Sequence, residues 1–191
     1  MQYIINNAYY LWSRWIESLK VDSQRKLTSR LQNGSMLMEN RLQQSLQRGA
    51  VRIRTDAAFQ QTTKQGAATA VVYNLDGSIH QCAYRRFKAE SALQAELQGA
   101  DLALKLAWKL NLRKILIESD CKLMVDALEE DGGTIDWSCF TIFSDGKTGI
   151  KEFAFVCFCW IKRSCNGQAH ELAKWACKCS VSHGTLSSLG L

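Results

Sequence analysis

The sequence predicts an α/β domain built on a mixed β-sheet, and two features carry this prediction. Three strand-like segments follow one another between residues 51 and 86, with a hairpin signal at Asp76 and Gly77 before the last of them. Two apolar runs, at 115–117 and within 152–163, are typical of strands buried on both faces of a mostly parallel sheet. Helical patterns precede and follow these runs, so the predicted order is three strands and a helix, then alternating strands and helices.

The composition fits one globular domain with an extension. The chain has 191 residues, of which 47% are hydrophobic and 22% charged, and its net charge of +6 permits binding to polyanions without requiring it. No apolar run approaches the ~20 residues that span a membrane, and no secretory signal is visible. We therefore expect an intracellular protein with no membrane partner. The eight cysteines form no CxxC pair, which argues against a zinc site and favours reduced thiols.

The domain is predicted to cover residues 49–180, after a partly helical extension at 1–48. In its first strand, apolar side chains alternate with polar ones, and Asp56 lies on the face opposite Val51 and Ile53. The segments 66–74 and 78–86 give the next two strands, so the first three strands form an antiparallel meander. A further helix is predicted near 136–147 and the last one at 168–179. Residues 181–191 are small and polar, which predicts a flexible tail.

Glu96 is an unusual residue in the longest predicted helix. Ser91 and Gln94 form a capping box at the start of this helix, which runs to about residue 110. Around Glu96, the helix face consists of small apolar residues that allow close approach to the sheet. A carboxylate placed there is costly unless something compensates its charge. The alternative is a glutamate at the edge of the apolar face that reaches water.

Asp120 comes directly after the buried strand at 115–117 and directly before a helical pattern. Taken alone, it is explained as a helix N-cap. Yet ligands of open α/β sheets bind at the carboxyl ends of strands. If this strand lies beside the first one, Asp120 and Asp56 become neighbours, and the long helix can bring Glu96 to the same point. Three clustered carboxylates favour a hard cation, which predicts a Mg²⁺ site, with Mn²⁺ as a substitute.

Four stretches in this order resemble a known family. They are TDAAF at 55–59, SALQAEL at 91–97, IESDC at 117–121 and NGQAHELAK at 166–174. Together they resemble the ribonuclease H-like domain of plant reverse-transcriptase-like proteins, related to the ribonuclease H of non-LTR retrotransposons. The resemblance implies a five-stranded mixed sheet in the order 3-2-1-4-5 with helices on both faces. It also implies cleavage of the RNA strand of RNA–DNA hybrids by a two-metal mechanism, in which one ion activates water and the other stabilises the leaving oxygen.

The family's metal-binding triad maps onto Asp56, Glu96 and Asp120, and its fourth acidic position maps onto His170. This departure matters because an imidazole offers one nitrogen and no negative charge, and nitrogen suits Mg²⁺ poorly. A second ion would then be held more weakly, or by substrate phosphate. The alternative is that His170 is a capping or surface residue.

Nucleic-acid contacts are predicted for basic and polar residues near these motifs. Phosphate contacts are expected from three basic residues before the long helix, namely Arg85, Arg86 and Lys88. Asn166 is predicted as a further contact. Lys162 and Arg163 flank the last strand and are similar candidates. Each basic cluster is equally explained as a solvated surface.

Three hypotheses follow from the sequence. The first is a monomeric, Mg²⁺-dependent nuclease that acts on RNA–DNA hybrids. The second is a catalytically weak or inactive module that binds nucleic acid or a protein, which His170 favours. The third is a retroelement remnant without a selected role.

Overall fold

The computed structural model describes residues 43–45, 48–130 and 135–187. All of them belong to one compact unit, Leu37–Leu191, which is distinct from Met1–Met36. The helices predicted for the extension lie outside the described residues, apart from a helical turn at 43–45. Residue 49, where the domain is predicted to start, lies inside this unit, and just before it the carbonyl oxygen of Arg48 accepts a hydrogen bond from Nζ of Lys114 at 3.1 Å.

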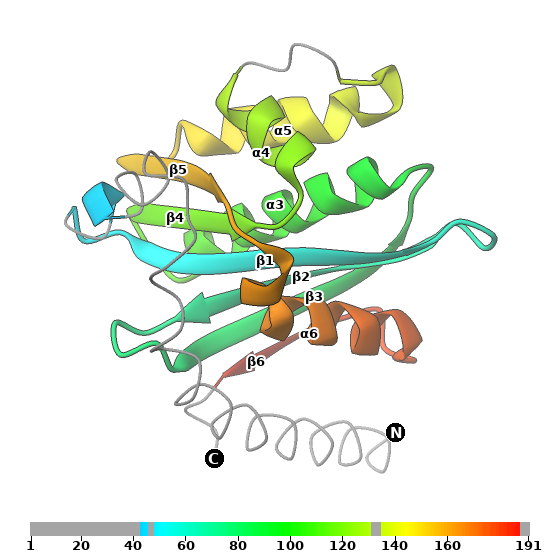
Figure 1. Ribbon diagram of the computed structural model, residues 1–191, viewed down its shortest axis with the longest axis horizontal. Helices are drawn as coiled ribbons and strands as arrows, with labels where there is room; N and C mark the ends of the chain where they lie inside the picture. The colour runs from blue at the N-terminus through cyan, green and yellow to red at the C-terminus, as the bar shows by residue number, and fades with distance from the viewer. Residues whose placement is uncertain (1–42, 46–47, 131–134, 188–191) are drawn as a thin grey trace. The chain divides into compact units, whose positions relative to one another are not determined.

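Six strands form one mixed sheet in the order β5-β4-β1-β2-β3-β6 (Figure 1). The strands β1 (Val51–Gln60), β2 (Gln65–Tyr73) and β3 (Ile79–Lys88) form the predicted antiparallel meander. Strand β4 (Lys114–Ser119) pairs in parallel with β1, and β5 (Phe155–Trp160) pairs in parallel with β4. The predicted α/β fold and the order 3-2-1-4-5 are therefore confirmed, with one further strand added beside β3.

Helices cover both faces of this sheet. The helices α3 (Ala92–Lys109), α4 (Lys122–Glu129) and α5 (Phe140–Ile150) lie on one side, and α6 (Gly167–Lys178) lies on the other (Figure 1). The short 3-10 helices η1 (Trp137–Cys139) and η2 (Arg163–Cys165) precede α5 and α6. Among the described residues, no helix combines the length and the apolar character needed to cross a membrane.

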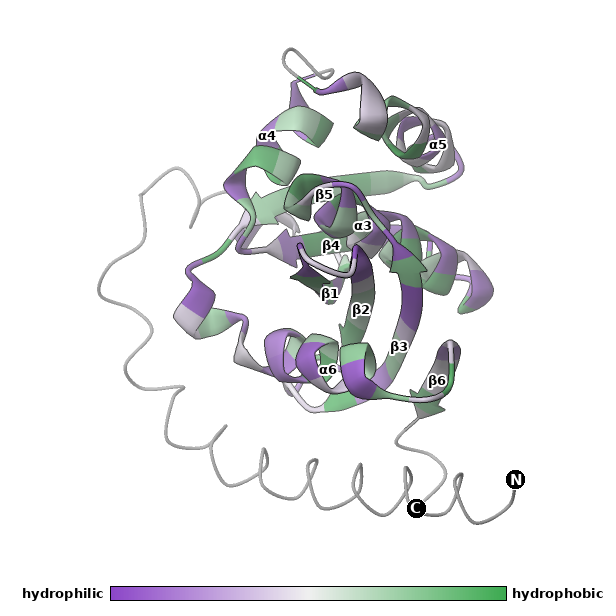
Figure 2. Cartoon of the chain, turned by 90° about the vertical axis from the view of Figure 1, so that its right-hand side faces the viewer, coloured by the Kyte–Doolittle hydropathy of each residue, from purple (hydrophilic) through white to green (hydrophobic). Residues whose placement is uncertain are grey.

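The main core lies between the sheet and the α3 side. Side chains of β1, β2 and β4 pack there against α3, α4 and α5, and β2 stands out as hydrophobic in Figure 2. Side chains alternate between the two faces of the sheet along β4. Ile115 and Ile117 therefore join this core, whereas Leu116 joins a smaller cluster on the other face. The charged and polar side chains of β1 and β4 that point away from this core therefore lie on the α6 side.

The start of α3 is fixed by its cap. Oγ of Ser91 accepts a hydrogen bond from the backbone N–H of Gln94 at 3.1 Å, as the capping-box pattern predicted. The reciprocal bond differs, since Oε1 of Gln94 accepts from the N–H of Glu90 at 2.6 Å rather than from Ser91. One turn after Glu96, Gly99 lies against β1, where an added Cβ would be in ordinary van der Waals contact, 3.5 Å from Cβ of Thr55 and 3.6 Å from the carbonyl oxygen of Asp56. The packing of α3 on β1 thus brings Glu96 to the strand that carries Asp56.

The last strand corrects the prediction of a flexible tail from residue 181. Strand β6 (His183–Ser187) pairs antiparallel with β3, and Gly184 lies opposite Tyr84. The sequence of this segment lacks the alternation of a strand. It nevertheless pairs with the backbone groups along the outer edge of β3, which would otherwise be unpaired. A glycine is needed at this place, because a Cβ on residue 184 would lie 2.7 Å from the ring of Tyr84.

Replacing Gly184 with Ala should detach or distort β6. The ring of Tyr84 has little room to yield, since it packs edge-on against Trp175 with 5.2 Å between the ring centroids. We expect Gly184→Ala to lower the free energy of unfolding by about 1–3 kcal/mol, the usual cost of overpacking. Urea unfolding of wild type and variant would measure this difference. The control is Gly167→Ala, where no heavy atom lies within 4 Å of the added Cβ. Equal stability of Gly184→Ala and wild type would contradict the close packing.

Candidate active site

The register between β1 and β4 places two of the predicted carboxylates side by side. Val51 lies opposite Ile115, and Arg54 lies opposite Glu118. Two residues further along both strands, this register brings Asp56 next to Asp120, which directly follows the end of β4. The two residues therefore meet at the carboxyl end of β4, as the sequence predicted.

Asp56 is buried in the middle of β1. Its side chain is 3% exposed, and Oδ2 accepts a hydrogen bond from Nδ1 of His170 at 2.9 Å. The pKa of Asp56 is raised to about 6, mainly by burial. The hydrogen bond from His170 acts against this shift, and the charge of Asp120 adds to it. Asp56 is thus a carboxylate whose negative charge is costly in this protein.

Glu96 on α3 completes the group. Its pKa is raised to about 9 by burial and then by the charges of Asp56 and Asp120. One oxygen of the carboxyl group, Oε2, is buried and has no hydrogen-bond partner among the described residues. Glu96 as a whole is partly exposed, but this oxygen is not, and the structure brings all three predicted carboxylates close enough to influence one another.

Asp120 does not cap α4. That helix has Cys121 at its N-cap position, and its first turn receives no side-chain cap. Instead, Oδ1 of Asp120 accepts from Nδ2 of Asn166 at 2.5 Å, and Oδ2 lies 3.7 Å from Nη1 of Arg163. The side chain of Asp120 is 8% exposed. Its surroundings belong to the acidic site rather than to the helix terminus.

Asn166, for which a nucleic-acid contact is predicted, is buried among protein groups. Its side chain is fully buried at the start of α6. Both hydrogens of its Nδ2 group are used, one by the carbonyl oxygen of Thr55 at 2.8 Å and one by Asp120. Asn166 therefore links β1, Asp120 and α6, and its role is to position the carboxylate.

His170 and Arg163 bring positive or hydrogen-donating groups to the same place. His170 lies on the first turn of α6, where its ring contacts Asp56. Nη2 of Arg163 lies 3.2 Å from Nε2 of His170. The sequence predicts only a flanking phosphate contact for Arg163, because its approach to the site depends on the turn between β5 and α6. The one available signal was its position three residues before Asn166.

The three basic residues before α3, for which phosphate contacts are predicted, do not share one face of β3. Arg85 and Arg86 point to opposite faces of β3. Nη2 of Arg85 pairs with Oδ2 of Asp101 on α3 at 2.8 Å, whereas Arg86 donates to the backbone carbonyl of Cys179 after α6. Lys88 alone of these three is exposed. Arg85 and Arg86 therefore attach helices to the sheet.

The donors of the site fit one hard cation. Three carboxylates, with an unpartnered buried oxygen on Glu96, are the oxygen ligands that Mg²⁺ prefers. Within the described part of the chain, no three Asp, Glu, His or Cys side chains already converge as a ligand cluster. Asp56 and Asp120 are turned instead toward His170 and Asn166. Binding of an ion would therefore require these side chains to close around it.

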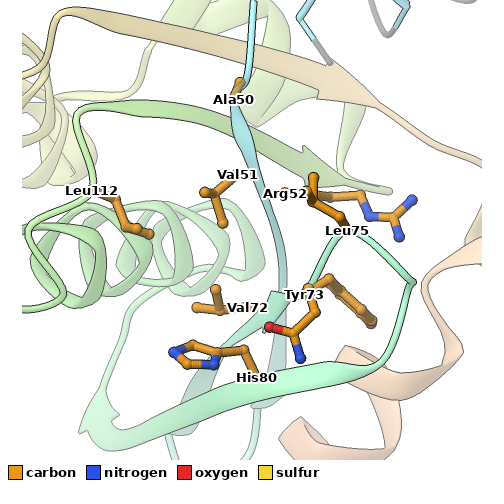
Figure 3. A pocket seen from close by; sticks show the side chains of 9 residues that line it. Ala50, Val51, Arg52, Val72, Tyr73, Leu75, His80 and Leu112 are labelled. Carbon is orange, nitrogen blue, oxygen red and sulfur yellow. The ribbon is translucent and has the colours of Figure 1, made fainter. Parts of the chain in front are cut away.

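A separate pocket lies at the other end of β1 (Figure 3). It has a volume of about 290 Å³ and is lined mainly by the start of β1 and the end of β2, with His80 and Leu112. None of the described residues that line it is a carboxylate. It offers no counterpart to the chemistry of the acidic site.

Comparison with known proteins identifies the domain. A family model described as reverse transcriptase-like matches residues 54–176, which contain Asp56, Glu96, Asp120 and His170. The chain belongs to the reverse transcriptase-like family. No curated protein shows significant sequence similarity to this reverse transcriptase-like chain.

Solved structures show that the reverse transcriptase-like domain has the ribonuclease H fold. The ribonuclease H1 of Halobacterium salinarum NRC-1 matches with a TM-score of 0.63 and 21% identity, over 68% of this chain and 98% of that one. The N-terminal ribonuclease H domain of a Mycobacterium tuberculosis protein matches with a TM-score of 0.61 and 19% identity, over 68% and 95% of the two chains. LC11-RNase H1, solved in complex with an RNA/DNA hybrid, matches with a TM-score of 0.62 and 16% identity, over 67% and 96%.

The raised pKa of Glu96 predicts how stability depends on pH without a metal ion. The folded protein keeps the Glu96 proton up to about pH 9, whereas the unfolded chain releases it near 4.5. Between these values folding takes up a proton, so stability falls as the pH rises. The variant Glu96→Gln has no proton to release at this position, so it should not lose stability in this way as the pH rises. In EDTA we expect the variant to have a higher Tm than wild type at pH 8 and a similar Tm at pH 4.

Calorimetry at both pH values would check this, with Glu171→Gln on the exposed side of α6 as the control. A Glu96→Gln variant that is less stable than wild type at pH 8 would contradict the assigned environment.

The buried amide of Asn166 predicts a stability effect. Asn166→Ala leaves the carbonyl oxygen of Thr55 and Oδ1 of Asp120 without this donor, which should cost about 1–3 kcal/mol of unfolding free energy. Chemical denaturation would measure it. A fully stable variant with weakened hybrid binding would instead support the original prediction of a nucleic-acid contact.

Proposed function

We propose that residues 49–180 act as a ribonuclease H-type nuclease that hydrolyses the RNA strand of RNA–DNA hybrids with Mg²⁺ or Mn²⁺. The observation that carries this proposal is the meeting of Asp56, Glu96 and Asp120 at the carboxyl end of β4 within a reverse transcriptase-like domain. Burial of the carboxylates supports it, because a cation offsets the repulsion that raises the pKa values of Asp56 and Glu96. The hybrid bound by LC11-RNase H1 supports the class of substrate.

The residues of the chain would have distinct roles in this reaction. Asp56, Glu96 and Asp120 would bind the metal ion, and Asn166 would fix the orientation of Asp120 through its hydrogen bond. A bound Mg²⁺ supplies Lewis acidity, which activates a water molecule and offsets charge on the phosphate. Lys162 and Arg163 are exposed beside the site, where they would contact substrate phosphates. We expect the protein to act as a monomer.

A second candidate function rests on the contact between His170 and Asp56. This hydrogen bond occupies one oxygen of a metal-binding carboxylate. A domain in which the contact persists would bind hybrids and cut them slowly or not at all. Hybrid affinity without cleavage, measured on folded protein, would favour this function over the nuclease.

The nuclease proposal predicts metal-dependent cutting that needs Asp120. A hybrid with labelled RNA should be cleaved in Mg²⁺ or Mn²⁺ and remain intact in EDTA. Asp120→Asn should lower the rate by more than about 100-fold, because it removes a charged ligand of the ion. Gel analysis of the labelled RNA gives the rates.

The matched control is Asp126→Asn, the same exchange in an exposed ion pair with Lys122 on α4. Its rate should equal that of wild type. Folded wild-type protein that cuts with neither metal would refute the nuclease, and unchanged cutting by Asp120→Asn would remove Asp120 from the site.

A further inference from the structure

Arg163 and His170 form a chain of contacts along one side of the acidic site. Nη2 of Arg163 lies 3.2 Å from Nε2 of His170, and Nδ1 of His170 lies 2.9 Å from Oδ2 of Asp56. Nη1 of the same guanidinium lies 3.7 Å from Oδ2 of Asp120. Side chains of the protein therefore already contact Asp56 and Asp120, two of the three carboxylates.

The donors and acceptors of this chain are mutually consistent. Nη2 of Arg163 lies 3.2 Å from Nε2 and 3.4 Å from Nδ1 of His170, and a guanidinium can only donate. An ionised carboxylate can only accept, so Nδ1 of His170 donates to Asp56 and Nε2 is the ring nitrogen left to accept from Arg163. The chain therefore runs from Arg163 through His170 to Asp56 without an unpaired ring nitrogen.

This arrangement does not fit a second divalent ion. A second ion on this side of Asp56 would need Oδ2, which His170 engages, and a further oxygen ligand, which position 170 does not provide. It would also lie close to the permanent positive charge of Arg163. Oε2 of Glu96, by contrast, is buried and has no hydrogen-bond partner among the described residues, although the charge of Arg163 is felt there.

The residue at position 170 also decides how many oxygen ligands the site has, because an imidazole offers none. A site with an aspartate at position 170 would carry one more negative charge and one more pair of oxygen ligands.

We propose that this site binds one divalent cation, held by Asp56, Glu96 and Asp120, and that Arg163 and His170 occupy the place of a second one. The inference rests on the metal site of the proposed function and states how many ions that site takes. It assigns the positive charge of Arg163 as the substitute for the charge of an ion, and His170 as the group that engages Oδ2 of Asp56. They are positioning groups for Asp56 and Asp120 rather than ligands.

The test counts Mn²⁺ ions on the full chain. Metal-free protein is titrated with Mn²⁺ alone, and the electron paramagnetic resonance signal of free Mn²⁺ gives the number bound. We expect one tightly bound ion per wild-type chain, two for His170→Asp, and one for the matched control His170→Asn. A dipolar-coupled Mn²⁺ pair should be visible in the spectrum of His170→Asp alone. Arg163→Gln should still bind one ion, and its affinity should rise by up to about 10-fold because a nearby positive charge is removed.

Two ions of comparable affinity on the wild-type chain would overturn the inference, whatever the variants do. A folded His170→Asp variant that still binds one ion would overturn the role of His170. Hybrid cleavage measured on the same samples separates this result from the proposed function. One bound ion without cleavage supports the inference and refutes the nuclease. Two bound ions with cleavage refute the inference and support the nuclease. No bound ion refutes both.

Discussion

Strands β1 and β4 run parallel in a single register, with Ile53 beside Ile117 and Arg54 beside Glu118. The apolar pair faces the core with α3, and the charged pair is buried on the opposite face, where Nε of Arg54 lies 2.6 Å from Oε2 of Glu118. Because side chains alternate, a shift of one residue would exchange these faces and separate Asp56 from Asp120. Burying an ion pair adds little net stability, but its loss is costly, so the pair fixes which register is allowed.

The acidic site combines a high local charge with the means to tolerate it. Burial and mutual repulsion raise the pKa values of Asp56 and Glu96. The side chains of His170, Asn166 and Arg163 contact Asp56 and Asp120. Oε2 of Glu96, in contrast, has no hydrogen-bond partner among the described residues. Groups that carry such unbalanced charge are concentrated at functional sites. The donors around the three carboxylates are therefore unevenly distributed.

Much of this arrangement could be predicted from the sequence because it follows from local periodicity. Alternation in β1 placed Asp56 on the correct face, the small residues of α3 singled out Glu96, and the end of a buried strand marked Asp120. The hairpin at Asp76 and Gly77 also forms as predicted, with Gly77 at a φ of 84°.

The features that were missed depend on tertiary contacts. Arg163 enters the site through the turn before α6, and Asn166 is buried by its bonds to Thr55 and Asp120. Neither the direction of a turn nor the burial of a polar side chain has a periodic signature. The segment of β6 has no strand-like pattern at all, and its structure comes from the open edge of β3.

Strand β6 has a practical consequence for handling the protein. It protects the edge of β3, which would otherwise present a row of free backbone groups to other chains. A shortened protein ending near residue 180 would expose that edge and become prone to self-association through sheet extension. An affinity tag joined directly at that point would carry the same risk, so the residues after α6 belong in any fragment that is meant to stay dispersed in solution.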